Sequence, residues 1–140
     1  MKKIILSLLL LTAIFNQTIS AGEKIHKVVI QVSTDDARTQ KIALNNAVNL
    51  QKLYGQDNVQ IEIVAYGPGL KMLTKKNIVS GRVASLAMSD IKFSACMNTM
   101  GKIHKKTGHS PVLTDGVGKV KAGVARIIEL QEEGYSYIRP

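Results

Sequence analysis

Cys96 is the residue of this 140-residue chain whose type and position best suit nucleophilic chemistry. It is the one cysteine, and it stands between a short apolar run, 91–95, and a segment of helical character, 97–106. The free backbone amides and the positive dipole end of a helix N-terminus stabilise a thiolate placed there. The same position also suits a small buried hydrophobe with an inert thiol. Position alone leaves both interpretations open.

Polar residues follow Cys96 directly and are candidates for a supporting role. Asn98 and Thr99 could donate a hydrogen bond to a sulfur group, or cap the helix, which is the commoner role of such residues. His104 is a poor partner as a base, because eight residues extend about 12 Å along a helix axis. We therefore expect Cys96 to carry the chemistry, with Asn98 and Thr99 in support.

Other motifs are better explained by structure than by ligands. Gly67-Pro68-Gly69 is typical of a tight turn. The segment 115–119 lacks the Gly-Lys-Ser/Thr ending of a phosphate-binding loop. His26, His104 and His109 match no spacing of metal ligands. We therefore predict neither a metal nor a cofactor.

The first 21 residues have the pattern of a secretory signal peptide. Lys2 and Lys3 precede an apolar run over 4–14, and small residues stand at Ser20 and Ala21. The apolar core of about 12 residues is too short to span a bilayer, and no later stretch is longer. We expect cleavage near residue 21, a periplasmic or secreted location, one domain over 22–140 and no membrane span.

The charge of the mature chain limits its partners. With Lys2 and Lys3 removed, 17 basic and 10 acidic residues leave a net charge of about +7. This charge favours anionic molecules, acidic partners or membrane surfaces. Scattered lysines, 4% aromatic residues and the absence of tryptophan argue against nucleic acid. A single cysteine excludes an internal disulfide and leaves open a disulfide between two chains.

Apolar runs and helical periodicity alternate along the chain. We predict strands at 28–32, 59–66, 91–95, within 112–120, and at 135–138. We predict helices at 36–54, 70–76, 81–87 and 97–106, the first of them with Ala43, Ala47, Leu50 and Tyr54 on one face. We predict a last helix where Val120, Val124, Ile127 and Ile128 fall on one face. Residues 33–35 are expected to cap the first helix and Gly134 to end the last. Alternating strands and helices predict an α/β fold with a largely parallel sheet, whose ligand crevice lies at the carboxyl ends of the strands.

Three segments resemble the DsrE/DsrF-like proteins, the superfamily that includes the TusD-type sulfur-relay subunits. They are the cysteine segment 93–100, the turn 64–70 and the C-terminal stretch 122–135. The resemblance implies a three-layer α/β fold, with a mostly parallel five-stranded sheet and helices on both faces. It also implies a homo-oligomer, often a trimer or hexamer. In the relay members the matching cysteine accepts sulfane sulfur as a persulfide and passes it to a partner, a role that here falls on Cys96.

Two hypotheses follow from different classes of protein. The first is an exported sulfur-handling protein, a carrier more than a turnover enzyme and sulfurtransferase-like at most, that accepts sulfur on Cys96 and exchanges it with a donor or acceptor protein. It predicts an acidic and partly exposed thiol. The alternative is a non-catalytic oligomeric module that binds a small ligand or a protein, with Cys96 merely packed. That alternative predicts a buried and slowly reacting thiol.

Overall fold

The computed structural model describes residues 24–140 of the chain, so the predicted signal peptide lies outside the described residues. Within this range, none of the helices has the length and apolar character needed to cross a membrane.

Five strands form one sheet in the order β4-β3-β2-β1-β5, and every neighbouring pair is parallel. The strands are β1 (His26–Val32), β2 (Val59–Ala65), β3 (Ile91–Cys96), β4 (Val117–Val120) and β5 (Ser136–Ile138). Because all are parallel, their carboxyl ends meet at a single edge of the sheet. The predicted α/β sheet is therefore confirmed.

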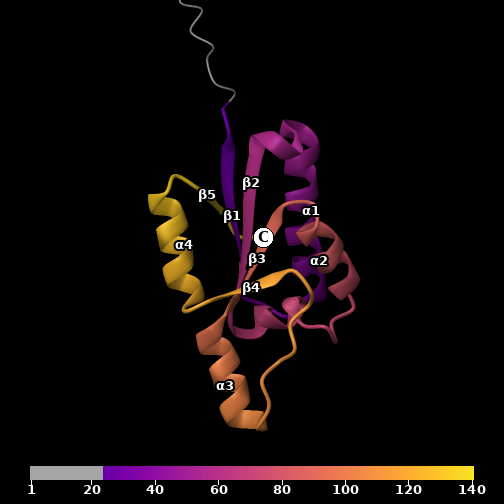
Figure 1. The fold of residues 1–140 in the computed structure, drawn as a ribbon, viewed down its shortest axis with the longest axis vertical. Coiled ribbons are helices and arrows are strands. Elements are labelled where there is room, and N and C mark those ends of the chain that lie inside the picture. Colours follow the sequence, from indigo (N-terminus) through magenta and orange to yellow (C-terminus); the bar gives the residue numbers. More distant parts are fainter. Residues whose placement is uncertain (1–23) are drawn as a thin grey trace, which may run out of the picture.

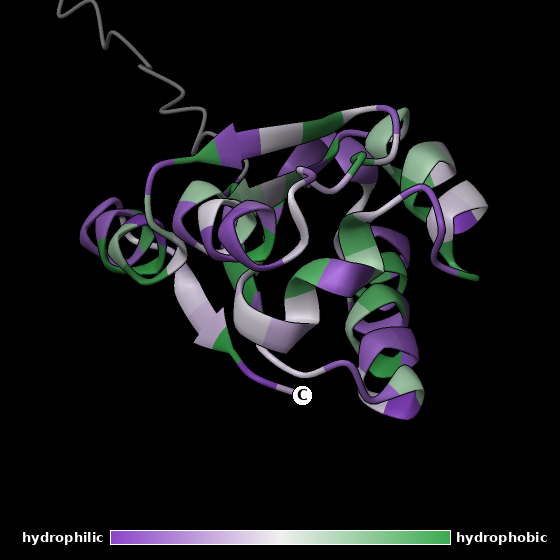
Figure 2. Ribbon diagram, turned by 90° about the horizontal axis from the view of Figure 1, so that it is seen from below, coloured by the Kyte–Doolittle hydropathy of each residue, from purple (hydrophilic) through white to green (hydrophobic). Residues whose placement is uncertain are grey.

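Helices cover both faces of the sheet. They are α1 (Ala37–Tyr54), α2 (Ser80–Ala87), α3 (Met97–Thr107) and α4 (Gly123–Glu132), with the short 3-10 helices η1 (Gln56–Asn58) and η2 (Gly67–Leu73). Helices α1 and α2 lie on one side and α4 on the other, while α3 projects beyond the carboxyl edge (Figure 1). The helix ribbons carry alternating hydrophobic and hydrophilic bands (Figure 2), as expected of helices with one face against a core.

Two hydrophobic cores explain the long apolar runs in the sequence. The main core lies between the sheet and helices α1 and α2, and Val28, Ile30 and Val32 face it. Val29, from the opposite face of β1, belongs to a second, smaller core with Val64, Ile127 and Leu130 beneath α4. A strand covered on both faces has apolar residues at consecutive positions, as β1 does.

The first helix has the predicted buried face, with a small difference at its start. Ala43 and Ala47 are fully buried, and Leu50 and Tyr54 pack against the core. The N-cap is Asp36 rather than a residue of 33–35. Its carboxylate accepts a hydrogen bond from the Thr39 amide at 2.7 Å. Gly55 ends the helix with φ 87°.

The last helix differs from the prediction in its start and in its buried face. Val120 is the final residue of β4, and α4 begins at Gly123. Val124 and Ile128 are 53% and 51% exposed, whereas Ile127 and Leu130 are buried. The predicted apolar face was right for Ile127 and wrong for Val124 and Ile128, because its spacing ran by coincidence across a strand, a turn and a helix. Packing of Ile127 and Leu130 against the sheet turns the other apolar residues outward.

Candidate functional site at Cys96

Cys96 lies at the carboxyl edge of the sheet, where it ends β3 and is also the N-cap of α3. It pairs in register with Val120 of β4. Side chains two residues apart in a strand share a face, so Cys96 is on the same face as Ser94. Ser94 contacts Glu62 on the side covered by α4, and the thiol therefore faces that side as well.

The N-terminus of a second helix also reaches Cys96. A Cβ atom on Gly123, the first residue of α4, would lie 3.3 Å from Cβ of Cys96 and 3.0 Å from Cβ of Tyr66. A Cβ atom here would make tight contacts with both side chains, and glycine allows the close approach without them. The positive ends of the α3 and α4 dipoles consequently converge on one thiol.

Burial and hydrogen bonding act in opposite directions on the Cys96 thiol. Burial raises its pKa, but interactions with the Thr99 and Gly123 backbone amides, the Thr99 hydroxyl and the Asn98 amide together lower the pKa below its ordinary value. The residue is nevertheless only 5% exposed. The lowered pKa agrees with the hypothesis of a reactive thiol, and the burial agrees with the hypothesis of a packed one. The partial exposure that was predicted for a reactive thiol is not found.

Thr99 and Asn98 contribute in different ways. The Thr99 hydroxyl accepts a hydrogen bond from the Gly67 amide at 2.9 Å, so it links the turn after β2 to the start of α3. Asn98 is exposed, and its backbone amide is the group that favours the thiolate. Neither of them holds the N-cap position, which belongs to Cys96.

The remaining sequence candidates lie away from the thiol or have packing roles. His104 and His109 are exposed, and His26 stacks on Tyr54 with ring centroids 3.7 Å apart. A Cβ on Gly69 would lie 2.2 Å from the Val32 carbonyl oxygen, so the turn at 67–69 needs glycine for packing. Over residues 24–140, no three His, Cys, Asp or Glu side chains gather as a metal site.

Two hollows flank the site without being lined by Cys96 itself. A groove of about 1020 Å³ lies over β2, β3 and β4 beside α4, and Val120 and Ala122 line it. A smaller hollow of about 470 Å³ is lined by Met97, Lys119 and residues of α3. Val120, which pairs with Cys96, lines the groove, and Met97, which follows Cys96, lines the smaller hollow, so each hollow reaches a residue next to Cys96.

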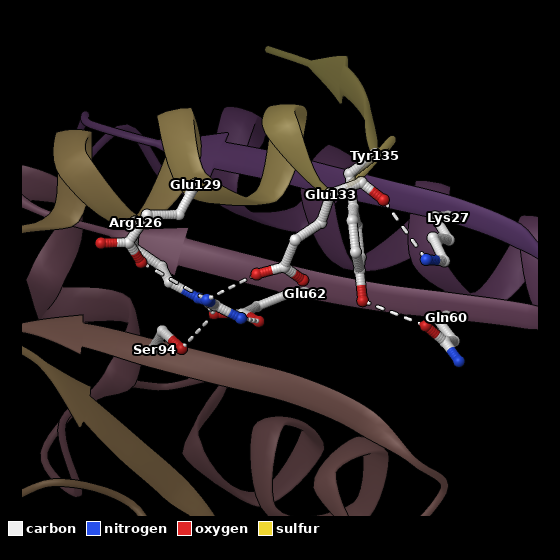
Figure 3. Close-up of polar contacts among 8 residues, drawn as sticks. All are labelled: Lys27, Gln60, Glu62, Ser94, Arg126, Glu129, Glu133 and Tyr135. Carbon is white, nitrogen blue, oxygen red and sulfur yellow. Dashed lines mark hydrogen bonds and ion pairs between the residues drawn. The ribbon is translucent and has the colours of Figure 1, made fainter.

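A buried ion pair beside the groove was not found from the sequence. Glu62 of β2 and Arg126 of α4 form two parallel hydrogen bonds of 3.0 and 2.9 Å, and Ser94 donates to the same carboxylate at 2.7 Å (Figure 3). Burial raises the Glu62 pKa, but Arg126, Ser94 and the Lys92 charge together lower it below the ordinary value. The available signal was an acidic residue, Glu62, directly between the apolar residues Ile61 and Ile63 of a predicted buried strand, where a charge needs a partner.

Comparison with known proteins relates the whole domain to solved structures. No protein-family model matches the chain, and no curated protein does. The structure of MTH1491 from Methanobacterium thermoautotrophicum, described as a protein of unknown function, matches with 34% identity and a TM-score of 0.73, over 82% of this chain and 99% of that one. The ychN protein from E. coli matches with 10% identity and a TM-score of 0.64, over 84% of this chain and 99% of that one, which is a likeness of fold. This chain therefore belongs to the family of MTH1491, and its fold is DsrE-like.

Proposed function

We propose that the protein is an exported sulfur carrier that accepts sulfane sulfur on Cys96 as a persulfide and hands it to a partner. The observation that carries this proposal is the convergence of the α3 and α4 N-termini on one thiol, whose pKa is lowered in spite of burial. A lowered pKa increases the thiolate fraction of a thiol, and the thiolate is its nucleophilic form.

The chemistry requires no reagent beyond donor and acceptor. The Cys96 thiolate attacks the sulfane sulfur of thiosulfate or of a polysulfide and forms a new S–S bond. The donor's own S–S bond breaks, and its electron pair leaves with sulfite or with the shortened polysulfide. An acceptor thiolate then attacks the outer sulfur of the persulfide, and Cys96 departs as a thiolate. A low thiol pKa helps both steps, since it raises the thiolate fraction and improves the leaving group.

The burial of Cys96 favours a small anionic donor. At 5% exposure the thiol is more accessible to a small ion that enters from a flanking hollow than to the cysteine of a folded protein. The positive charge of the mature chain attracts such anions. Once loaded, the outer sulfur stands about 2 Å from Sγ, and it is this atom that an acceptor must reach.

Export and assembly are parts of the same proposal. Removal of residues 1–21 would give a periplasmic or secreted domain, and the intact mass of the protein recovered outside the cytoplasm tests this. The homo-oligomer, a trimer or a hexamer, is what the resemblance implies, and Val124 and Ile128 form an exposed apolar pair on α4 that an interface would cover. Light scattering of the mature protein measures its mass in solution, and a monomer would contradict the assembly.

A transfer assay tests the function directly. The purified protein is exposed to thiosulfate or polysulfide, freed of donor, and treated with cyanide, which removes sulfane sulfur as thiocyanate. Wild type should yield thiocyanate, and Cys96→Ser should yield none while it keeps its fold by circular dichroism. Thiocyanate release from a folded Cys96→Ser protein would exclude Cys96 as the carrier.

The burial of Cys96 also supports the second candidate, a non-catalytic oligomeric binding module in which this cysteine is structural. That module would react with iodoacetamide only as fast as the protein unfolds, and its serine variant would lose stability alone. A native thiol that reacts much faster than unfolding, with a rate that rises through a low pH midpoint, would exclude the module.

A further inference from the structure

A buried carboxylate joins β2 to α4 through two hydrogen bonds. Arg126 donates from Nε to Oε1 of Glu62 at 3.0 Å and from Nη2 to Oε2 at 2.9 Å. The Glu62 side chain is 3% exposed and that of Arg126 is 23% exposed. A bidentate pair of this kind fixes both the distance and the orientation of the guanidinium. It therefore determines where this turn of α4 lies over the sheet.

The same carboxylate also joins α4 to the strand that carries Cys96. Ser94 donates from Oγ to Oε1 of Glu62 at 2.7 Å, within the buried part of the molecule. Ser94 lies two residues before Cys96 in β3 and on the same face. Glu62 thus connects Arg126 of α4 to Ser94 of β3 (Figure 3), in the strand that ends at Cys96.

Gly123 and Arg126 belong to one turn of α4, three residues apart, and so share a face of the helix. Gly123 lies against Cys96 and Tyr66, so closely that an added Cβ atom would make contacts of 3.0 to 3.3 Å with their side chains. The first turn of α4 is consequently attached to the sheet at two points. One point is the close approach at Cys96, and the other is the ion pair with Glu62.

We propose that Glu62 and Arg126 are positioning residues whose buried ion pair holds the N-terminus of α4, and with it the Gly123 amide, against Cys96. The inference rests on the proposed function in one respect, that Cys96 acts as a thiolate. A helix N-terminus has its electrostatic effect within about one turn, so a displacement of α4 removes much of this effect from the sulfur. Ser94 supports the pair by fixing the carboxylate.

The outer contacts of Arg126 provide a matched control. Nη1 lies 3.5 Å from Glu129 and 3.5 Å from Glu133, whose side chains are 58% and 53% exposed. Exposed pairs at this distance contribute little, because water screens them. Glu129→Gln removes a carboxylate beside Arg126 and leaves the Glu62 pair intact.

The test is the pH dependence of iodoacetamide alkylation of Cys96, in the full mature protein, for wild type, Glu62→Gln, Arg126→Met and Glu129→Gln. The pH at the midpoint of the rate profile reports the pKa of the Cys96 thiol, and the rate on the high-pH plateau reports how accessible the thiol is to iodoacetamide. We expect the midpoint to rise in Glu62→Gln and Arg126→Met and to stay unchanged in Glu129→Gln. Arg126→Lys, which keeps the charge but not the bidentate geometry, should give an intermediate midpoint.

Two further variants separate positioning from general stability. Val83→Ala creates a cavity in the core on the opposite face of the sheet, and it should lower the melting temperature without moving the midpoint. If a single variant of the ion pair fails to fold, the double variant Glu62→Met/Arg126→Met leaves no unpaired buried charge, and its midpoint should be raised. Folded ion-pair variants with the wild-type midpoint would overturn the proposal.

Failure of this inference is distinguishable from failure of the proposed function. A raised midpoint in the ion-pair variants, with no sulfur loading of wild type, would keep the positioning role and exclude the carrier. Sulfur loading of wild type with an unchanged midpoint in the variants would exclude the positioning role and keep the carrier.

Discussion

At the scale of single residues, Cys96 is a buried thiol whose pKa is nevertheless lowered. Burial alone would raise the thiol pKa, and the amides of Asn98, Thr99 and Gly123 reverse this effect. The place of Cys96 at a strand end could be predicted, because it depends on neighbouring residues. The Gly123 contact could not be predicted, because it depends on how the chain returns to the sheet 27 residues later.

Thr99 gives the first test at this scale. Thr99→Val removes the hydroxyl that favours the thiolate, so the Cys96 pKa should rise, as measured by the pH profile of alkylation. The change also leaves the Gly67 amide without its partner, and the free energy of unfolding should fall by about 1 kcal/mol. Thr99→Ser should restore both quantities.

Asn98→Ala is the control for Thr99→Val, because the backbone amide of residue 98 is what acts on the sulfur and alanine retains it. A similar rise in the alkylation midpoint for Asn98→Ala would contradict the roles given to these two residues.

At the scale of elements, the important relation is between α4 and the sheet. The sequence predicts a helix in this region, and of its predicted apolar face only Ile127 is buried in the core. Its apolar pattern includes Val124 and Ile128, which point outward, and it omits Arg126, whose charge is neutralised by Glu62. The spacing of apolar residues within one helix cannot predict that Arg126 pairs with Glu62, which lies 64 positions earlier in the sequence. Glu62 within an apolar strand was the sign that some basic residue had to meet it.

Gly123 tests the close approach of α4 to Cys96. Gly123→Ala places a Cβ 3.0 Å from Cβ of Tyr66 and 3.3 Å from Cβ of Cys96, so these side chains or the helix must give by a few tenths of an ångström. We expect the free energy of unfolding to fall by about 1–3 kcal/mol and the thiol pKa to rise. Denaturant unfolding and the alkylation profile measure the two effects.

Gly101→Ala is the matched control for Gly123→Ala. Nothing lies within 4 Å of a Cβ at this position inside α3, so alanine should be neutral or stabilise by about 0.5–1 kcal/mol. Equal losses of stability in the two variants would show that the packing at Gly123 is not special.

The pH dependence of stability tests the Glu62 pair. The pKa of Glu62 in the folded protein is lowered, so its contribution is complete above the unfolded pKa of about 4.3 and is lost as the pH falls through the folded value. Urea unfolding between pH 6 and pH 3 should therefore show a steeper loss for wild type than for Glu62→Gln. Parallel curves would mean that the pair contributes no pH-dependent stability.

At the scale of the whole molecule, the three layers were predictable because the pattern of alternating elements leaves few arrangements. Both faces of β1 are covered, and its consecutive apolar residues indicated this. The groove beside α4 was not predicted. It arises because α4 packs over β1 and β2 and leaves part of the β3 and β4 face open, which is a matter of helix placement.

The layered core predicts that the same isoleucine-to-asparagine change affects the free energy of unfolding very differently at Ile30 and at Ile78. Ile30 is fully buried between the sheet and α1, whereas Ile78 is 94% exposed. Ile30→Asn should lower the free energy of unfolding by several kcal/mol, because it buries an unpaired amide. Ile78→Asn should change it by less than about 0.5 kcal/mol. Thermal melts followed by circular dichroism that showed similar stability for both would contradict the position of Ile30.

The most direct measurement of the central claim is the intact mass of the native mature protein before and after exposure to thiosulfate or polysulfide. Wild type should gain the mass of a sulfur atom and lose it again on treatment with a reductant. Cys96→Ser should remain unchanged throughout. A wild-type protein that takes up no sulfur, or a folded serine variant that takes up as much, would contradict the assignment of Cys96 as a sulfur acceptor.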